Sequence, residues 1–196
     1  KELSNALTTT TSVFTHFKQN DEPRPFNKLR ATRFTYGARN LTRYDTELAG
    51  IPLSVSAGGE VFQESFQRQT FENLDGTTGA LLTNVLQDRF YWNAFLKTRV
   101  ELTNRLTVEA GLNRNKTRYA QEDLNIADSL EPGTSEFEES DQSGSYDFEP
   151  IWSPRVGLNY QLSSNYSTYA SASRGFARPS VQETLSPSGG LNPDIQ

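Results

Sequence analysis

Apolar and polar residues alternate with a period of two along much of the chain. Residues 89–103 show this most clearly: one face carries Phe90, Trp92, Ala94, Leu96, Val100 and Leu102, interrupted by Thr98, and the other carries Asn93, Lys97, Arg99 and Glu101 with Tyr91 and Phe95. Because successive side chains of a strand point to opposite sides, this pattern predicts a strand with one apolar and one polar face. The same pattern, weaker in places, predicts strands at 3–18, 31–44, 51–71, 106–121, 154–162 and 166–174.

The connections between these seven strands alternate between short and long. Residues 45–50, 104–105 and 163–165 are short connections, whereas 19–30, 72–88 and 122–153 are long and polar. Antiparallel up-and-down barrels of the bacterial outer membrane have short periplasmic turns and long extracellular loops. Five of the seven predicted strands also exceed the about 9–11 residues that cross a bilayer. We therefore expect an all-β transmembrane barrel segment whose strands project beyond the membrane on the long-loop side.

Aromatic residues gather near both ends of the predicted strands. Near the long connections lie Phe14, Phe17, Phe34, Tyr36, Phe62, Phe66, Phe90, Tyr91, Trp92, Tyr119 and Trp152, and near the short ones lie Tyr44, Tyr160 and Tyr166. Two aromatic belts are typical of proteins anchored at both membrane interfaces. The alternative is the general enrichment of aromatic residues in strands.

Composition narrows the function classes. The mean hydropathy of −0.66 is too polar for a helical membrane protein, and no apolar run approaches the roughly 18 residues of a spanning helix. The net charge of −5 argues against nucleic acid as a partner. The chain has no Cys, and His16 is its only histidine, so a zinc site or a Ser-His-Asp triad would depend on one residue. We expect no enzymatic activity and no cofactor.

Three stretches near the C-terminus resemble TonB-dependent outer-membrane receptors of the ferric-citrate and siderophore type. They read WSPRVGLNY at 152–160, YASASRGFARPS at 169–180 and LNPDI at 191–195. The residues that carry the resemblance are Ser153, Pro154, Arg155, Gly157, Arg174, Gly175, Phe176, Pro179, Glu183, Asn192 and Pro193. In that family the first stretch is a strand, the second returns and enters an extracellular loop, and the third introduces the next strand.

The resemblance implies uptake of a ferric siderophore or similar iron chelate across the outer membrane of a Gram-negative bacterium. The implied partners are outer-membrane lipid and the TonB–ExbB–ExbD complex, which would act through a plug domain. A glycan importer on the same fold is one alternative. Another is a soluble β-sandwich that binds carbohydrate through exposed aromatics and buries the apolar face of 89–103 between two sheets.

The resemblance also predicts that residues 1–196 are an internal part of the barrel domain, with the plug domain and the remaining strands absent. Family barrels have about 22 strands, and even the smallest spanning barrels need about eight. Seven strands would leave unpaired edges, which favour association. We therefore expect the segment to need the rest of the receptor.

Two groups of residues are candidates for binding. Arg33, Arg39, Lys97, Arg99, Glu101 and Glu109 occupy polar strand faces, where they would form a salt-bridged wall of the lumen or contact the plug or an anionic substrate. Residues 121–150 contain ten acidic residues and no Lys or Arg. Such a run is typical of a solvated, repulsive loop, but its alternating oxygen ligands also suggest a weak calcium site at Asp141, Asp147 and Glu149.

Overall fold

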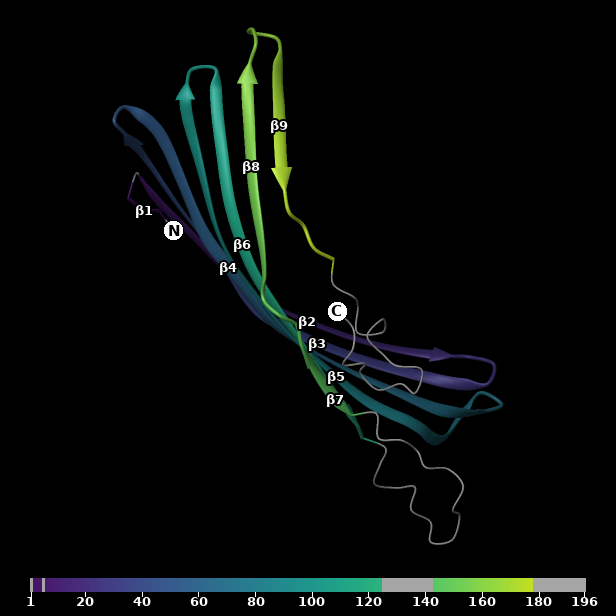
Figure 1. Cartoon of the computed structure of the whole chain (residues 1–196). Coiled ribbons are helices and arrows are strands. Elements are labelled where there is room, and N and C mark those ends of the chain that lie inside the picture. The colour runs from purple at the N-terminus through teal and green to yellow at the C-terminus, as the bar shows by residue number, and fades with distance from the viewer. Residues whose placement is uncertain (1, 5, 125–142, 178–196) are drawn as a thin grey trace.

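A computed structural model of the protein describes residues 2–4, 6–124 and 143–177, and these form one antiparallel sheet (Figure 1). Its strands are β1 (Glu2–Ser4), β2 (Leu7–Pro23), β3 (Asn27–Leu48), β4 (Ile51–Leu74), β5 (Thr77–Thr103), β6 (Leu106–Asp123), β7 (Gly144–Asp147), β8 (Ile151–Gln161) and β9 (Ser167–Ser173). Each strand pairs with the next along the chain, except that β7 and β8 both pair with β6. This is the up-and-down order that the sequence predicts.

The seven predicted strands are confirmed as β2 to β6, β8 and β9. The strand predicted at 3–18 is divided into β1 and β2, and β7 lies within the connection predicted at 122–153. Within the part of the chain that the structure describes, no helix is long and apolar enough to cross a membrane. The described residues also form a single sheet, so the two-sheet sandwich alternative is wrong.

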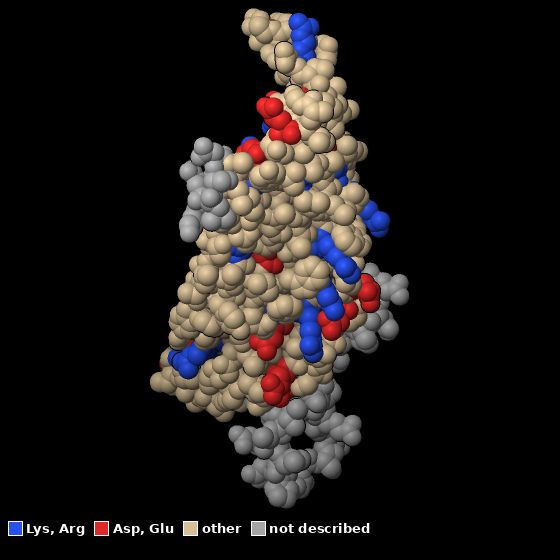
Figure 2. Space-filling view, turned by 90° about the vertical axis from the view of Figure 1, so that its left-hand side faces the viewer, with Lys and Arg blue, Asp and Glu red and all other residues tan. Residues whose placement is uncertain are grey.

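Figure 1 shows a strongly twisted sheet with two distinct ends. At the upper end, here called the turn end, the connections are Ala49–Gly50, Asn104–Arg105 and residues 162–166. At the opposite end, here called the loop end, lie the connections 24–26 and 75–76 and the far ends of β6 and β7. Figure 2 shows one side of the molecule, where most of the visible acidic and basic side chains lie in the lower half, toward the loop end.

The connections predicted at 19–30 and 72–88 are wrong. In the structure β2 and β3 run on to a three-residue turn at 24–26, and β4 and β5 run on to a two-residue turn at 75–76. The connection predicted at 45–50 is likewise only Ala49–Gly50. The alternation that identifies a half-buried strand disappears where both faces are polar, although the backbone pairing continues. Residues 125–142 of the third long connection lie outside the described residues.

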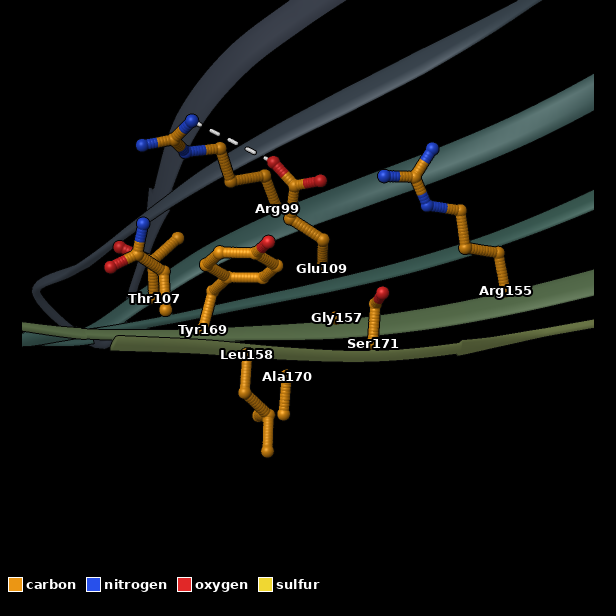
Figure 3. Close-up of a pocket in the computed structure, with 10 residues that line it drawn as sticks. Arg99, Thr107, Glu109, Arg155, Gly157, Leu158, Tyr169, Ala170 and Ser171 are labelled. Atoms are coloured by element: carbon orange, nitrogen blue, oxygen red, sulfur yellow. Dashed lines mark ion pairs between the residues drawn. The ribbon is translucent and has the colours of Figure 1, made fainter. Parts of the chain in front are cut away.

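The cross-strand register sorts the side chains onto two faces, because directly paired residues point to the same side. One row, for example, pairs Val13 with Ala38, Ala38 with Val61 and Val61 with Trp92. The face containing this row is here called the apolar face. The opposite side is the polar face, where Lys97 pairs with Gly111 and Gly111 with Arg155. In Figure 3, Leu158 and Ala170 point to one side of β8 and β9, and Tyr169 and Ser171 to the other.

The apolar face carries large side chains that no other part of the described chain covers. Val13 is 82% exposed and Leu96 is 51% exposed. Among the described apolar residues only Val85 and Tyr119 are buried. A soluble domain of this size would bury a substantial core, so this sheet relies on an apolar environment outside itself. Along β5, the apolar run from residue 90 to 100 matches the about 9–11 residues of a tilted spanning strand.

Aromatic side chains border this apolar band at both ends. On the apolar face, the set toward the loop end is Phe17, Phe34, Tyr36, Phe90, Trp92 and Trp152, and the set toward the turn end is Tyr44 and Tyr160. This arrangement fits two interfacial belts. Five of the aromatics expected in the belt instead lie on the polar face, namely Phe14, Phe62, Phe66, Tyr91 and Tyr119.

Candidate functional site

A cluster of charged side chains lies on the polar face toward the turn end. It consists of Lys97, Arg99 and Glu101 on β5, Glu109 on β6 and Arg155 on β8, and is here called the polar-face cluster. Glu109 is its centre, because its carboxylate oxygens lie 3.0 Å from Lys97 Nζ and 3.6 Å from Arg99 Nη1. Arg99 Nη2 lies 3.7 Å from Glu101 Oε1. Figure 3 shows Arg99, Glu109 and Arg155 projecting to the same side of the sheet.

Glycine makes room beside these charges. Gly157 pairs with Glu109 across the β6–β8 ladder, and Gly111 stands between Lys97 and Arg155. Since glycine has no side chain, each of these positions leaves a depression. One groove of about 260 Å³ is lined by Arg99, Thr107, Glu109, Arg155, Gly157, Leu158, Asn159, Tyr169, Ala170 and Ser171 (Figure 3). A second groove of about 390 Å³, to which neither glycine contributes, is lined by Arg43, Ser54, Ser56, Lys97, Arg99, Glu101 and Glu109.

The cluster has more cations than carboxylates. Lys97, Arg99 and Arg155 stand beside two carboxylates, those of Glu101 and Glu109. Arg43 adds a further guanidinium to the second groove. Guanidinium groups bind carboxylate and phosphate in bidentate fashion. The grooves can therefore accept an anionic group by hydrogen bonding, with Tyr169 and Ser171 offering hydroxyl groups at the rim (Figure 3).

The six predicted site residues separate into two groups. Lys97, Arg99, Glu101 and Glu109 come together in the polar-face cluster. Arg33 and Arg39 lie on β3, nearer the loop end, and each stacks on a ring: Arg33 lies 4.8 Å from the Phe66 centroid and Arg39 lies 5.5 Å from the Phe14 centroid. Arg33 also lies 3.9 Å from a carboxylate oxygen of Glu64. Their part in substrate binding stays a prediction.

Sequence reasoning did not place Arg43 or Tyr169 in this site, and it assigned Arg155 only to the family motif. All three occupy odd positions of strands whose odd positions face the cluster. The alternation alone thus indicates that these three side chains point to the polar face. It does not give the cross-strand register, which decides that residues of β3, β5, β8 and β9 lie near one another.

The first two motif stretches lie side by side. Ser153, Pro154, Arg155 and Gly157 are in β8, and Arg174, Gly175 and Phe176 follow β9. The Arg174 backbone N–H donates to the Pro154 carbonyl oxygen at 3.0 Å, which extends the β8–β9 ladder by one position. Pro179, Glu183, Asn192 and Pro193 lie outside the described residues.

The predicted calcium ligands gain no support. Asp141 lies outside the described residues. The Asp147 carboxylate is engaged by cations, with Lys116 Nζ at 3.1 Å and Arg118 Nε at 3.9 Å. The residues that the structure describes contain no group of three or more His, Cys, Asp or Glu side chains suited to a metal ion.

At the loop end, the tips of the β2–β3 and β4–β5 hairpins are fastened together. Asn73 Nδ2 donates to the Arg24 carbonyl oxygen at 2.7 Å, and Lys28 Nζ donates to the Gly76 carbonyl oxygen. Within the first tip Arg30 Nε lies 2.7 Å from Asp21 Oδ1. Hydrogen bonds from Arg30, and secondly from Gln19, lower the pKa of the Asp21 carboxyl. The tips therefore form one connected polar edge.

Several solved receptors share this fold. The chain is similar to the ferric citrate transporter FecA in its unliganded form, with TM-score 0.63 and 13% identity over 87% of this chain and 25% of that one. It is also similar to the siderophore receptor PiuA from Acinetobacter baumannii, with TM-score 0.64 and 12% identity over 87% of this chain and 30% of that one. For the alcaligin outer-membrane receptor FauA from Bordetella pertussis, the TM-score is 0.55 and the identity is 18% over 97% of this chain and 36% of that one. The chain thus spans a quarter to about a third of their lengths.

The match at the level of sequence is to one family. A search of curated proteins finds no match. The model of the TonB-dependent receptor-like β-barrel matches residues 2–196, and members of this family sit in the Gram-negative outer membrane. The single up-and-down sheet, its apolar band and its charged opposite face agree with that model. The chain belongs to the TonB-dependent receptor β-barrel family.

Proposed function

We propose that this chain is part of the barrel wall of an outer-membrane receptor that imports a ferric siderophore or a similar iron chelate. The observation that carries the proposal is the division of one open sheet into an uncovered apolar band and a charged opposite face. The apolar band would face lipid and the charged face would line the lumen. The names of similar receptors, which include a ferric citrate transporter and a siderophore receptor, support the substrate class.

In this proposal the loop end is extracellular and the turn end is periplasmic. The ligand is captured at the loop end and released past the polar-face cluster after a plug domain moves. The TonB–ExbB–ExbD complex supplies the energy through that plug domain. The residues of this chain bind and guide the ligand and form no covalent bond with it, so no enzymatic activity is expected.

The two outer strands of the sheet are the sites at which the barrel would continue. The described sheet ends at β1 and β2 on one side and at β9 on the other. Among the described residues no further strand follows at either edge, and an open sheet edge is costly in a bilayer. We propose that neighbouring strands of the same receptor pair with both edges, so that residues 1–196 form a partial barrel domain.

Uptake by the full-length receptor tests the proposal. Radiolabelled iron bound to citrate, to a catecholate and to a hydroxamate siderophore is supplied to a strain that lacks other iron receptors. Uptake of at least one chelate should require both the receptor and TonB. Uptake of an oligosaccharide instead of any iron chelate, or iron uptake that persists without TonB, would contradict it.

A further inference from the structure

Three basic residues stand in a row on the side of β6 that otherwise faces the apolar surroundings. Arg114, Lys116 and Arg118 occupy alternate positions of β6, and their cross-strand partners Ala94, Trp92 and Phe90 belong to the apolar face. The row begins immediately after Leu112, which is 42% exposed in the apolar band. We call these three residues the β6 basic row.

The row lies at the depth of the loop-end aromatic belt. Arg114 pairs with Trp152 on β8, and its guanidinium carbon lies 4.9 Å from the Trp152 ring centroid. Since Trp rings prefer the headgroup level of a membrane, the Trp152 contact would place Arg114 at the edge of that level, with Lys116 and Arg118 further toward the loop end. Long basic side chains commonly extend from such positions into the headgroup region.

On strands β2 to β5, the outward residues in register with this row carry no charge. Opposite the β6 basic row, the outward residues of β2 to β5 are Thr11, Val13, Thr15, Asn40, Ala38, Tyr36, Gly59, Val61, Gln63, Ala94, Trp92 and Phe90. None of these is charged. Among these register-matched outward positions, positive charge is therefore confined to β6.

The carboxylates nearby leave room for an anion. Asp147 on β7 lies 3.1 Å from Lys116 and 3.9 Å from Arg118. Asp88 shares with Arg118 a groove of about 350 Å³, lined by Gln63, Asp88, Phe90, Arg118 and Ala120. Glu122 lies four residues after Arg118 on the same side of β6, beyond the belt. Among the described residues no carboxylate forms an ion pair with Arg114, and the Arg118 side chain is 55% exposed.

We propose that the β6 basic row binds the phosphate groups of a phosphorylated glycolipid in the outer leaflet, such as lipid A. Phosphate oxygens accept hydrogen bonds from guanidinium groups in bidentate fashion, and juxtamembrane basic clusters recognise anionic headgroups. The occupant is a lipid rather than a free anion because the row borders the apolar band and Trp152, which would contact acyl chains. This inference rests on the proposed function, which places this face in the outer membrane.

Native mass spectrometry of the full-length receptor tests the inference. The purified protein in a zwitterionic detergent is titrated with bis-phosphorylated lipid A, with dephosphorylated lipid A and with inorganic phosphate. R114Q/R118Q should weaken binding of the phosphorylated lipid about 25-fold, since each cation near a membrane surface contributes a factor of about five. K28Q/R30Q is the matched control, because it removes two outward cations of β3 that lie beyond the belt, and it should change binding less than twofold.

The Asp147 carboxylate provides a test with the opposite sign. D147N frees Lys116 and Arg118 from their ion-pair partner and should strengthen binding of the phosphorylated lipid about fivefold. A purely structural role for these ion pairs predicts no gain. Equal loss in both double variants, no gain in D147N, equal binding of the dephosphorylated lipid, or competition by millimolar inorganic phosphate would each overturn the inference. The mobility of the unheated receptor on gels is measured separately, and its failure to show a folded barrel would contradict the proposed function instead.

Discussion

The β4–β5 hairpin has two halves with different chemistry. In the half nearer the turn end, residues 53–63 pair with 90–100, one face is apolar and the other is polar. In the half nearer the loop end, residues 64–74 pair with 77–89, and both faces carry polar side chains. The backbone pairing is continuous through both. The comparison shows that strand pairing does not require an apolar face, which in the proposed function is the face that meets the membrane.

Polar contacts replace the apolar band in the projecting half. On the outward side Gln67 Nε2 donates to Asn84 Oδ1 at 2.9 Å, and on the polar-face side Gln87 Nε2 donates to Gln121 Oε1 at 2.7 Å. At the tip, Asn73 Oδ1 accepts from the Gly76 backbone N–H at 2.9 Å. These bonds join the long strands without burial of an apolar face, whereas in the proposed function the other half relies on lipid.

The largest expected effect comes from an arginine on the apolar face of β5. Leu96→Arg places a charge in the middle of the band and should destabilise the folded barrel by about 2–4 kcal/mol. Leu86→Arg is the matched control, since Leu86 also faces outward but lies in the projecting half, where the cost should be below about 1 kcal/mol. Urea titration of the full-length receptor in lipid vesicles measures both. Equal costs at the two positions would contradict the comparison.

A smaller effect is expected at the tip of the projecting half. Asp75 and Gly76 both have positive φ, 48° and 93°. A side chain in the left-handed region costs about 1–2 kcal/mol, so Gly76→Val should loosen the tip and speed amide exchange at residues 73–78. Assembly of the barrel should not change. Gly50→Val, at φ 77° in the turn end, is the control for the same backbone strain at the other end of the sheet.

Asn73 should have a lesser effect because it acts through two hydrogen bonds. Asn73→Ala removes the bond to the Arg24 carbonyl oxygen and the bond from the Gly76 N–H. At an exposed site each net contribution is at most about 1 kcal/mol. Amide exchange should rise at both tips, residues 24–28 and 73–78, because Asn73 joins them. A rise confined to one tip would show that the tips are independent.

The smallest effect concerns pH. The hydrogen bond from Arg30 lowers the pKa of Asp21, so this pair stabilises the tip above the ordinary pKa of an aspartate. That contribution is lost as the pH falls through the lowered pKa. Amide exchange at 19–30 should therefore increase in acid, and Asp21→Asn should remove this part of the pH dependence. Because the pair is exposed, high salt should weaken it as well.

The contrast between the two halves also explains what the sequence could predict. Period-two alternation predicts residues 89–103 as a strand because one face carries apolar side chains and the other polar ones. It does not predict residues 72–88 because both faces there carry polar side chains, so apolar and polar residues do not alternate. Another signal was present there, since Asp75-Gly76 is a typical two-residue hairpin turn, and the positive φ values at both positions agree with it. Turn chemistry would thus have joined β4 to β5 directly.

The polar-face cluster was partly predictable. Alternation placed Arg99 and Glu109 on polar faces, but their contact depends on a bulge near the β5–β6 turn. Glu101 pairs with Thr107 and Thr103 pairs with Leu106, so Leu102 is an extra residue. Without that extra residue Arg99 would face Ala110. A bulge is required to keep the two polar faces together, but its position follows from local geometry that spacing does not reveal.

Lipid access along β5 tests the central claim most directly. The chain contains no Cys, so single cysteines at positions 78–102 of a full-length receptor without other cysteines can carry spin labels. Collision with oxygen, which is enriched in lipid, is compared with collision with a water-soluble nickel complex. We predict period-two oxygen access from 90 to 100 and water access at both parities from 78 to 88. Alternating oxygen access that continues to residue 78, or its absence between 90 and 100, would contradict the account.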